Sequence, residues 1–297
     1  MISYINDQVE WFGQNWNRFW FTPTNGENLL RLRLLICSAA ALWFAISITN
    51  NQWWFGAAGW NADDLARSLN VATEGTWPGR FRVSPLWSSS QPLFFQIWAC
   101  AGGLVAVLAA VGIGGRAAMF VLFLLTLFLA QRLTWSTGAF EPALTAMLGY
   151  MVIDPGPSLV RRPDLAEHRR WSATLTTRLL QVHGWLLIVA ALAGQVSSAA
   201  WWRGEAVWWM AVAGKSNLFA PEFLRGHLLA VNALTHAISI CTLTAVLTLW
   251  STRLRPIGLL CGCALGVAYA LINDQILYGC LLTALLLGSF RRCRPKR

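Results

Sequence analysis

Charged side chains are scarce in this sequence. Of its 297 residues, 12% are Asp, Glu, Lys or Arg, whereas 56% are hydrophobic. A soluble domain normally has about a quarter charged residues, so this chain has too few charges to cover its apolar surface in water. The composition excludes an ordinary soluble enzyme and a disordered chain. It indicates a protein that crosses a membrane several times.

Lysine is almost absent. The 23 basic residues include only Lys215 and Lys296 as lysines, and the net charge is +10. No polar segment is long enough to present a basic face to nucleic acid, so we expect no nucleic-acid partner. Anionic lipid headgroups and the excess of basic residues in cytoplasmic loops explain the arginines better.

The seven cysteines do not form a metal-binding pattern. Most lie inside apolar runs, where a thiol behaves as a small apolar side chain. Cys261-x-Cys263 lacks the spacing and the accompanying histidines of a zinc site. We therefore expect no metal centre. The sequence also has no nucleotide-binding glycine loop and no nucleophile elbow, so it assigns no catalytic residue and leaves open whether the protein is an enzyme.

Apolar runs of membrane-spanning length dominate the chain. About 20 helical residues cross ~30 Å of hydrocarbon, and eight candidate helices reach or approach this length. The fourth and the eighth are short, which favours a different tilt or a re-entrant path. The sequence thus predicts an all-α polytopic transmembrane helical bundle. Its spans are expected at residues 31–49, 92–113, 116–133, 139–153, 173–197, 226–250, 254–272 and 275–290.

Three segments make up the predicted domain organisation. Residues 1–25 interleave aromatic and polar side chains and predict an amphipathic helix in the membrane interface. Residues 26–290 form the transmembrane domain, which includes a Trp-rich loop over residues 50–91 that we expect to fold against the membrane surface. Residues 291–297 form a basic tail.

Basic residues follow every second predicted span. By the positive-inside rule this pattern places both termini in the cytoplasm, and we expect the protein in a bacterial inner membrane. The residues concerned are Arg116, Arg161, Arg162, Arg169, Arg170, Arg253, Arg255 and the basic tail.

Polar side chains inside hydrocarbon need a partner or a cavity, and the sixth predicted span carries a stripe of them. Their spacing places them on one helical face, where they either line a cavity or form interhelical hydrogen bonds. The stripe consists of Asn232, Thr235, His236, Ser239 and Thr242.

The fifth predicted span carries a second polar set. Gln181 and Gln195 are two heptads apart and share a face, whereas His183 points nearly the opposite way. Arg178 lies near the cytoplasmic end, where a lipid phosphate or a buried carboxylate would be its partner. A histidine at this depth is either a hydrogen-bonded packing residue, a proton carrier or a ligand to haem or chlorin. The last option applies to His183 and His236.

Glu141 is the only carboxylate within a predicted span. Three interpretations remain open for it. It caps the start of the fourth helix, pairs with Arg132 across the short preceding turn, or faces a site in the outer half of the bundle. The seventh span contributes a stripe of three glycines, Gly258, Gly262 and Gly266, that allows close helix approach.

The order of several motifs resembles the HTTM family, membrane domains related to vitamin K-dependent gamma-carboxylase. The resemblance covers about residues 16 to 290. It begins with an aromatic segment, Trp16-x-x-Phe19-Trp20-Phe21-x-Pro23, and continues with Gly138-x-x-Glu141. Its clearest part is Arg178-Leu179-Leu180-Gln181-Val182-His183, similar to the family pattern R-L-x-Q-V-H, and Thr235-His236 follows at the expected distance.

In carboxylating members of this family, oxygenation of reduced vitamin K produces the base that removes a proton from a peptide glutamate. A lysine in the pattern A-G-L-x-K-L starts the deprotonation of the quinol. The resemblance places Gln195 at that position, and a neutral amide can orient a quinone oxygen but cannot accept the proton. The glutamate that often follows the Thr-His motif is also missing, with Leu243 or Thr244 in its place. The resemblance therefore implies the scaffold without its general base.

Two functions follow from these observations. In the first, the chain is a gamma-carboxylase-like membrane protein that has lost carboxylation and binds a quinone or a lipid. In the second, it is a non-catalytic structural or accessory subunit of a larger membrane complex for electron transfer or light harvesting, with lipids and other membrane proteins as partners. A transporter is less favoured because no inverted repeat is evident. The candidate pocket residues are His183, Gln195, His236, Asn232, Glu141, Arg178 and Gln181.

Overall fold

The structure is a computed structural model, and within the residues it describes the chain is helical and has no β-strand. The structure describes a small part of the loop at 50–91 and none of the tail at 291–297. It also describes part of the segment at 1–25, in which residues 16–21 are helical. The described residues are 13–14, 16–22, 27–55, 84–88, 91–133, 138–160, 171–214 and 224–290.

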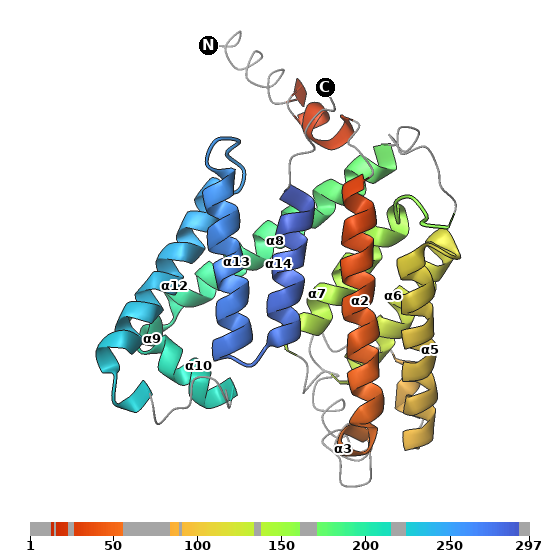
Figure 1. Cartoon of the computed structure of the whole chain (residues 1–297), viewed down its shortest axis with the longest axis horizontal. Helices are drawn as coiled ribbons and strands as arrows, with labels where there is room; N and C mark the ends of the chain where they lie inside the picture. The colour runs from red at the N-terminus through yellow and green to blue at the C-terminus, as the bar shows by residue number, and fades with distance from the viewer. Residues whose placement is uncertain are drawn as a thin grey trace, which may run out of the picture. The chain divides into compact units, whose positions relative to one another are not determined.

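All eight predicted spans are helices, and their ends lie within a few residues of the expected bounds (Figure 1). Six of them are long and apolar enough to cross a membrane, while α7 and α14 are shorter, as predicted. The chain is thus an all-α polytopic helical bundle. The eight are α2 (Glu27–Thr49), α5 (Pro92–Val111), α6 (Gly115–Arg132), α7 (Phe140–Ile153), α8 (Trp171–Ser197), α12 (Leu228–Thr248), α13 (Arg255–Ile272) and α14 (Ile276–Phe290).

Within the described residues, four complete short helices lie between these long ones. They occupy the connections rather than the predicted spans, and only α10 has more than two turns. They are α3 (Asn51–Phe55), η2 (Pro85–Ser88), α9 (Ala199–Trp202) and α10 (Ala206–Gly214).

The polypeptide forms two compact units. Residues 33–160 make one unit, and residues 1–32 together with 161–297 make the other. In the first unit α5 packs on α6 and α6 packs on α7. The α5–α6 turn depends on Gly112, which has a φ of 89°. A Cβ there would lie 2.8 Å from the backbone of Ser158.

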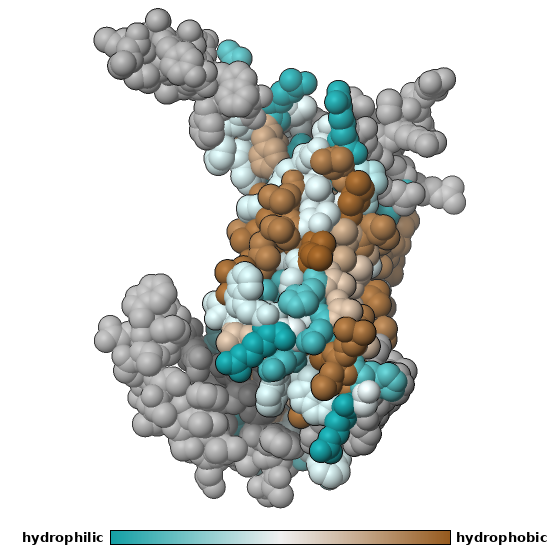
Figure 2. Space-filling view, turned by 90° about the vertical axis from the view of Figure 1, so that its left-hand side faces the viewer, coloured by the Kyte–Doolittle hydropathy of each residue, from teal (hydrophilic) through white to brown (hydrophobic). Residues whose placement is uncertain are grey.

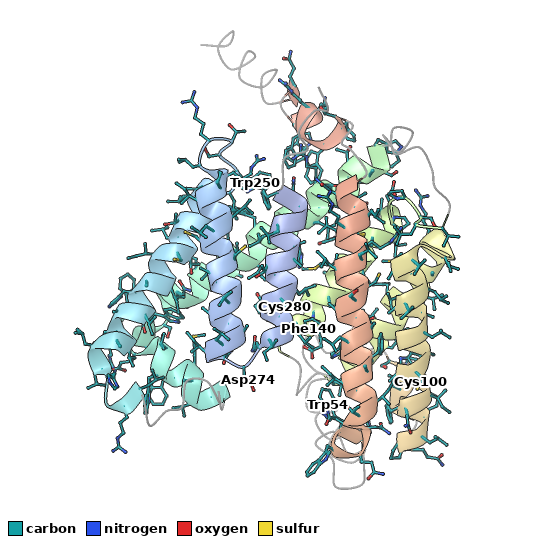
Figure 3. All side chains as sticks on the ribbon, in the orientation of Figure 1. Trp54, Cys100, Phe140, Trp250, Asp274 and Cys280 are labelled. Carbon is teal, nitrogen blue, oxygen red and sulfur yellow. The ribbon has the colours of Figure 1, made fainter. Side chains whose placement is uncertain are left out.

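In the second unit α12, α13 and α14 form successive antiparallel pairs, and α8 packs against both α12 and α14 (Figure 1). Figure 3 labels Trp250 at the α12–α13 turn and Asp274 at the α13–α14 turn, which lie at opposite ends of α13. Asp274 has a positive φ of 53°, a conformation that Asp tolerates better than most residues.

The predicted glycine stripe of α13 is a packing surface, and all three glycines are buried. A Cβ on Gly258 would lie 2.9 Å from the backbone nitrogen of Leu249, the C-cap residue of α12, and one on Gly262 would lie 2.6 Å from Leu286 in α14. Gly266 meets the backbone of α14, where its Cβ would lie 2.7 Å from the carbonyl oxygen of Gly279. Backbone cannot move aside as a side chain can, so Gly266 sets the distance between the two helices.

We expect Gly266→Ala to lower the stability of the protein by about 1–3 kcal/mol, because overpacking forces the two backbones apart. The matched control is Gly194→Ala in α8, since a Cβ at Gly194 meets nothing within 4 Å. The control should be neutral or slightly stabilising, because alanine favours the helix by about 1 kcal/mol over glycine. Thermal unfolding in detergent measures both, and equal effects would contradict the close-contact role.

Candidate functional site

A polar seam joins α8, α10 and α12 in the second unit. It consists of Gln195, Thr235 and Thr242, all buried. The Gln195 Nε2 donates to the Thr242 hydroxyl over 3.0 Å. The backbone N–H of Val207 in α10 donates to the Thr235 hydroxyl over 3.2 Å. The seam therefore connects three helices through buried side chains.

The two threonines act as acceptors because each donates its own proton within α12. The Thr235 hydroxyl donates to the Val231 carbonyl at 2.9 Å, and the Thr242 hydroxyl donates to the Ile238 carbonyl at 2.8 Å. This bond to the preceding turn satisfies the hydroxyl hydrogen inside the helix. The oxygen lone pairs then remain available for the neighbouring helices.

Gln195 lies deep in the bundle although it is near the end of α8. Its partner Thr242 is 14 residues beyond Leu228, the first residue of α12. At 1.5 Å per residue this is about 21 Å along the helix. Thr242 is also six residues, about 9 Å, before Thr248 at the other end of the helix. Gln195 therefore contacts α12 away from both of its ends.

The amide of Gln195 is only half satisfied. The side chain is 4% exposed, and its Oε1 is buried without a hydrogen-bond partner. A buried acceptor without a donor costs about 1–3 kcal/mol. A hydroxyl or amide donor placed against Oε1 would remove that cost. The Oε1 of Gln195 is therefore an unpaired acceptor within the seam.

Arg178 belongs to a different cluster, at the other end of α8. Its Nη1 donates to Gln181 Oε1 at 2.8 Å, and its Nε donates to the Phe19 carbonyl at 3.0 Å. The guanidinium lies 4.5 Å from the centroid of the Phe19 ring. The Gln181 Nε2 then donates to the Ser289 carbonyl in α14 at 2.5 Å. These contacts use backbone and amide oxygens rather than the lipid phosphate or carboxylate expected for Arg178.

The Arg178 cluster fixes the helical residues 16–21 on the second unit. Besides its contact with Arg178, Phe19 packs against Trp250, with ring centroids 5.5 Å apart. Trp250 in turn contacts Phe290 at 5.4 Å. The aromatic segment that opens the family resemblance is thus held against α8, α14 and the end of α12.

Glu141 caps α7. It is 8% exposed and lies in the first turn of the helix, where its Oε2 accepts the backbone N–H of Gly138 at 3.0 Å. A carboxylate at this position satisfies a free donor and interacts favourably with the helix dipole. Of the three interpretations that the sequence left open, the structure shows the cap. Glu141 belongs to the first unit and the other six candidate residues to the second.

Asn232 and His236 are the exposed members of the α12 stripe, while Thr235 and Thr242 are buried. Asn232 lies against Gly204, whose φ is 77° and where a Cβ would overlap the Asn232 side chain. His183 is half-buried on α8. The candidate residues therefore form four groups: the Gln195 seam, the Arg178–Gln181 cluster, the Glu141 cap, and the exposed Asn232 and His236. His183 belongs to none of these groups.

Arg33 is a buried arginine that the sequence interpretation did not single out. It is 1% exposed, and its guanidinium donates to the carbonyl oxygens of Pro155 at 3.0 Å, Gly156 at 3.3 Å and Ala110 at 3.3 Å. It ties α2 to the last turn of α5 and to the segment that follows α7 in the first unit. The signal was present, because an arginine inside an apolar run always needs such partners.

Among the described residues, no group of three or more His, Cys, Asp or Glu side chains is placed to hold a metal ion. No protein-family model, curated protein or solved structure matches this chain.

The two buried glutamines of α8 give a direct test of the site geometry. Gln181→Met should lower stability by about 1–3 kcal/mol, because the Arg178 Nη1 and the Ser289 carbonyl each lose a hydrogen bond to Gln181. Gln195→Met loses one hydrogen bond but also removes the unpaired Oε1, so its effect should stay within about 1 kcal/mol. Thermal unfolding in detergent compares the two. A Gln195 variant as unstable as the Gln181 variant would mean that Oε1 has a protein partner.

Proposed function

We propose that this chain is a gamma-carboxylase-like HTTM membrane protein that does not carboxylate and that binds a quinol or a hydroxylated lipid at Gln195. The observation that carries the proposal is the buried Oε1 of Gln195, which has no donor. A quinol hydroxyl would donate to Oε1. After oxidation, the quinone carbonyl would accept the second hydrogen of Nε2, since only one of the two is used on Thr242.

Loss of carboxylation follows from the chemistry of the amide. The nitrogen lone pair of Gln195 is delocalised, so the side chain orients a quinol oxygen but does not take its proton. Both lysines of the chain, Lys215 and Lys296, lie outside the described helices and outside the predicted spans. The site thus has a hydrogen-bonding group where the family resemblance expects a base.

The family assignment is supported by contacts between separate motifs. Phe19 of the aromatic segment accepts the hydrogen bond of Arg178 in the R-L-x-Q-V-H-like stretch. Thr235 of the Thr-His pair belongs to the same seam as Gln195. Motifs far apart in the sequence therefore meet in one unit, as expected if their order reflects a common scaffold.

The bound molecule can be identified by extracting the protein in mild detergent and analysing its small molecules by mass spectrometry. We expect a quinone, quinol or hydroxylated lipid to co-purify with the unaltered chain. In Gln195→Met its retention should fall about tenfold, the effect of one lost hydrogen bond to a buried site. Gly194→Ala, next to Gln195 but with open space at its Cβ, is the control and should retain the ligand. A reproducibly empty bundle, or equal retention in Gln195→Met, would overturn the proposal.

A second candidate function, an accessory subunit of a larger membrane complex, is favoured by the outward side of α12. Asn232 and His236 are exposed there beside Leu229 and Ile240, which are 84% and 65% exposed. Figure 2 faces this side of the molecule, with apolar side chains across its middle and hydrophilic ones gathered below. Polar side chains at membrane depth are costly next to lipid, and a neighbouring helix would supply partners for them.

Co-purification tests this second candidate. After mild extraction, an accessory subunit should co-purify with a stoichiometric protein partner. The double variant with Asn232→Leu and His236→Leu should no longer co-purify with that partner. If the complex contains haem or chlorin bound by His183 or His236, the preparation should absorb visible light and the His→Ala variant should lose the band. A colourless, monodisperse monomer would contradict both forms of the candidate.

A further inference from the structure

The hydrogen-bond chain through Thr242 has a fixed direction. The Thr242 hydroxyl donates to the Ile238 carbonyl at 2.8 Å, and a hydroxyl has only one hydrogen to donate. Toward Gln195 the Thr242 oxygen is therefore an acceptor. The Gln195 Nε2 supplies the donor over 3.0 Å, so the chain runs from α8 through Thr242 to the backbone of α12.

This direction decides which end of the Gln195 amide is paired. A glutamine amide has an oxygen that accepts and a nitrogen that donates, and a half turn of the amide exchanges their places. In the rotated form Oε1 would face the Thr242 oxygen, and two acceptors would meet unless the hydroxyl gave up the Ile238 carbonyl. Because Gln195 and Thr242 are both buried, the lost bond would not be replaced by water, and the rotated form is disfavoured.

The atom of the Gln195 amide that remains unpaired is consequently an acceptor. It is the buried Oε1. Hydrogen bonds linked in one direction polarise one another, so the bond from Nε2 to Thr242 strengthens Oε1 as an acceptor. An O–H or N–H group complements this atom. An ether or ketone oxygen can accept only the second hydrogen of Nε2, and it leaves Oε1 unpaired.

The other threonine of the seam shows why the Gln195 pair differs. The Thr235 hydroxyl also donates to its own helix, at the Val231 carbonyl, and it accepts the backbone N–H of Val207. A backbone N–H has one hydrogen, which this bond uses completely. The Thr242 bond instead uses one end of an amide, and it fixes the direction in which the other end points.

We propose that Thr242 is a positioning residue that orients the Gln195 amide and thereby restricts the site to ligands that donate a hydrogen bond. The inference rests on the ligand site proposed at Gln195 and adds the selectivity of that site. A ligand with a hydroxyl group pairs with Oε1, whereas the methyl ether of the same ligand does not. Thr242 acts through the amide, so it needs no contact with the ligand.

The test offers two ligands at once to the full-length chain in detergent. Equal amounts of 4-dodecylphenol, which donates a hydrogen bond, and 4-dodecylanisole, its methyl ether, are added, and native mass spectrometry measures how much of each is bound. We expect the phenol to exceed the ether at least about tenfold, because the ether leaves a buried acceptor unpaired. The ratio is taken within one sample, so a loss of folded protein does not change it.

Three variants separate positioning from packing. Thr242→Val keeps the shape of the side chain without the hydroxyl, so the amide can rotate and offer Nε2 to the ether, and the ratio should fall to about threefold or less. Thr242→Ser retains the hydroxyl and should keep the ratio of the unaltered chain. Thr177→Val is the matched control and should also keep it. Thr177 is buried and donates to the preceding turn of α8, at the Ala173 carbonyl over 2.8 Å, but it lies outside the seam.

The outcomes distinguish this inference from the proposed function. If neither ligand binds the unaltered chain, the ligand site at Gln195 is overturned and its selectivity with it. If both ligands bind equally and Gln195→Met loses both, the ligand site stands and the restriction to donors is overturned. If Thr242→Val keeps the preference for the phenol, or if Thr177→Val loses it as completely, the positioning role of Thr242 is overturned.

Discussion

The absence of water from hydrocarbon governs this structure, because each polar group at membrane depth must find its partner within the protein. Helix formation pairs the backbone N–H and C=O groups with one another. The hydroxyls of Thr235 and Thr242 satisfy themselves by donating to the preceding turn, and Arg33 collects three backbone carbonyls. Several buried polar atoms of the described residues are nevertheless unpaired, and the Oε1 of Gln195 is the one that lies in the polar seam. It is for that reason the most informative atom of the candidate site.

The same constraint divides the polar residues into structural and functional sets. Arg178 has the type and position of a ligand-binding cation, but two of its donors bind Phe19 and Gln181 within the protein. Glu141 is the carboxylate that a site would need, and it caps α7. Gln195 attracts less notice in a sequence, yet it alone of these three retains an unpaired buried atom. Chemical type therefore predicts the function of these residues less well than the number of their hydrogen-bonding groups that remain unused.

The helices could be predicted closely from the sequence, since the length of an apolar run translates directly into the length of a spanning helix. The stripe from Gly258 to Gly266 likewise predicted close packing, although the sequence did not say that its members face two different helices. The site was less predictable. His236 and Thr242 lie on a common helical stripe by spacing, but one is exposed and the other buried, because the boundary of a contact surface depends on the helix that covers it.

The sequence by itself determined that the chain is a membrane-type bundle, where its helices begin and end, and that no lysine base lies in a predicted span. These properties are local, since they depend on hydropathy and residue identity along a single segment. Only the tertiary structure decided that Gln195 bonds Thr242 and that Arg178 holds Phe19. Each of these contacts joins segments whose relative rotation and depth are set by packing between helices, and no run of residues in one helix encodes that geometry alone.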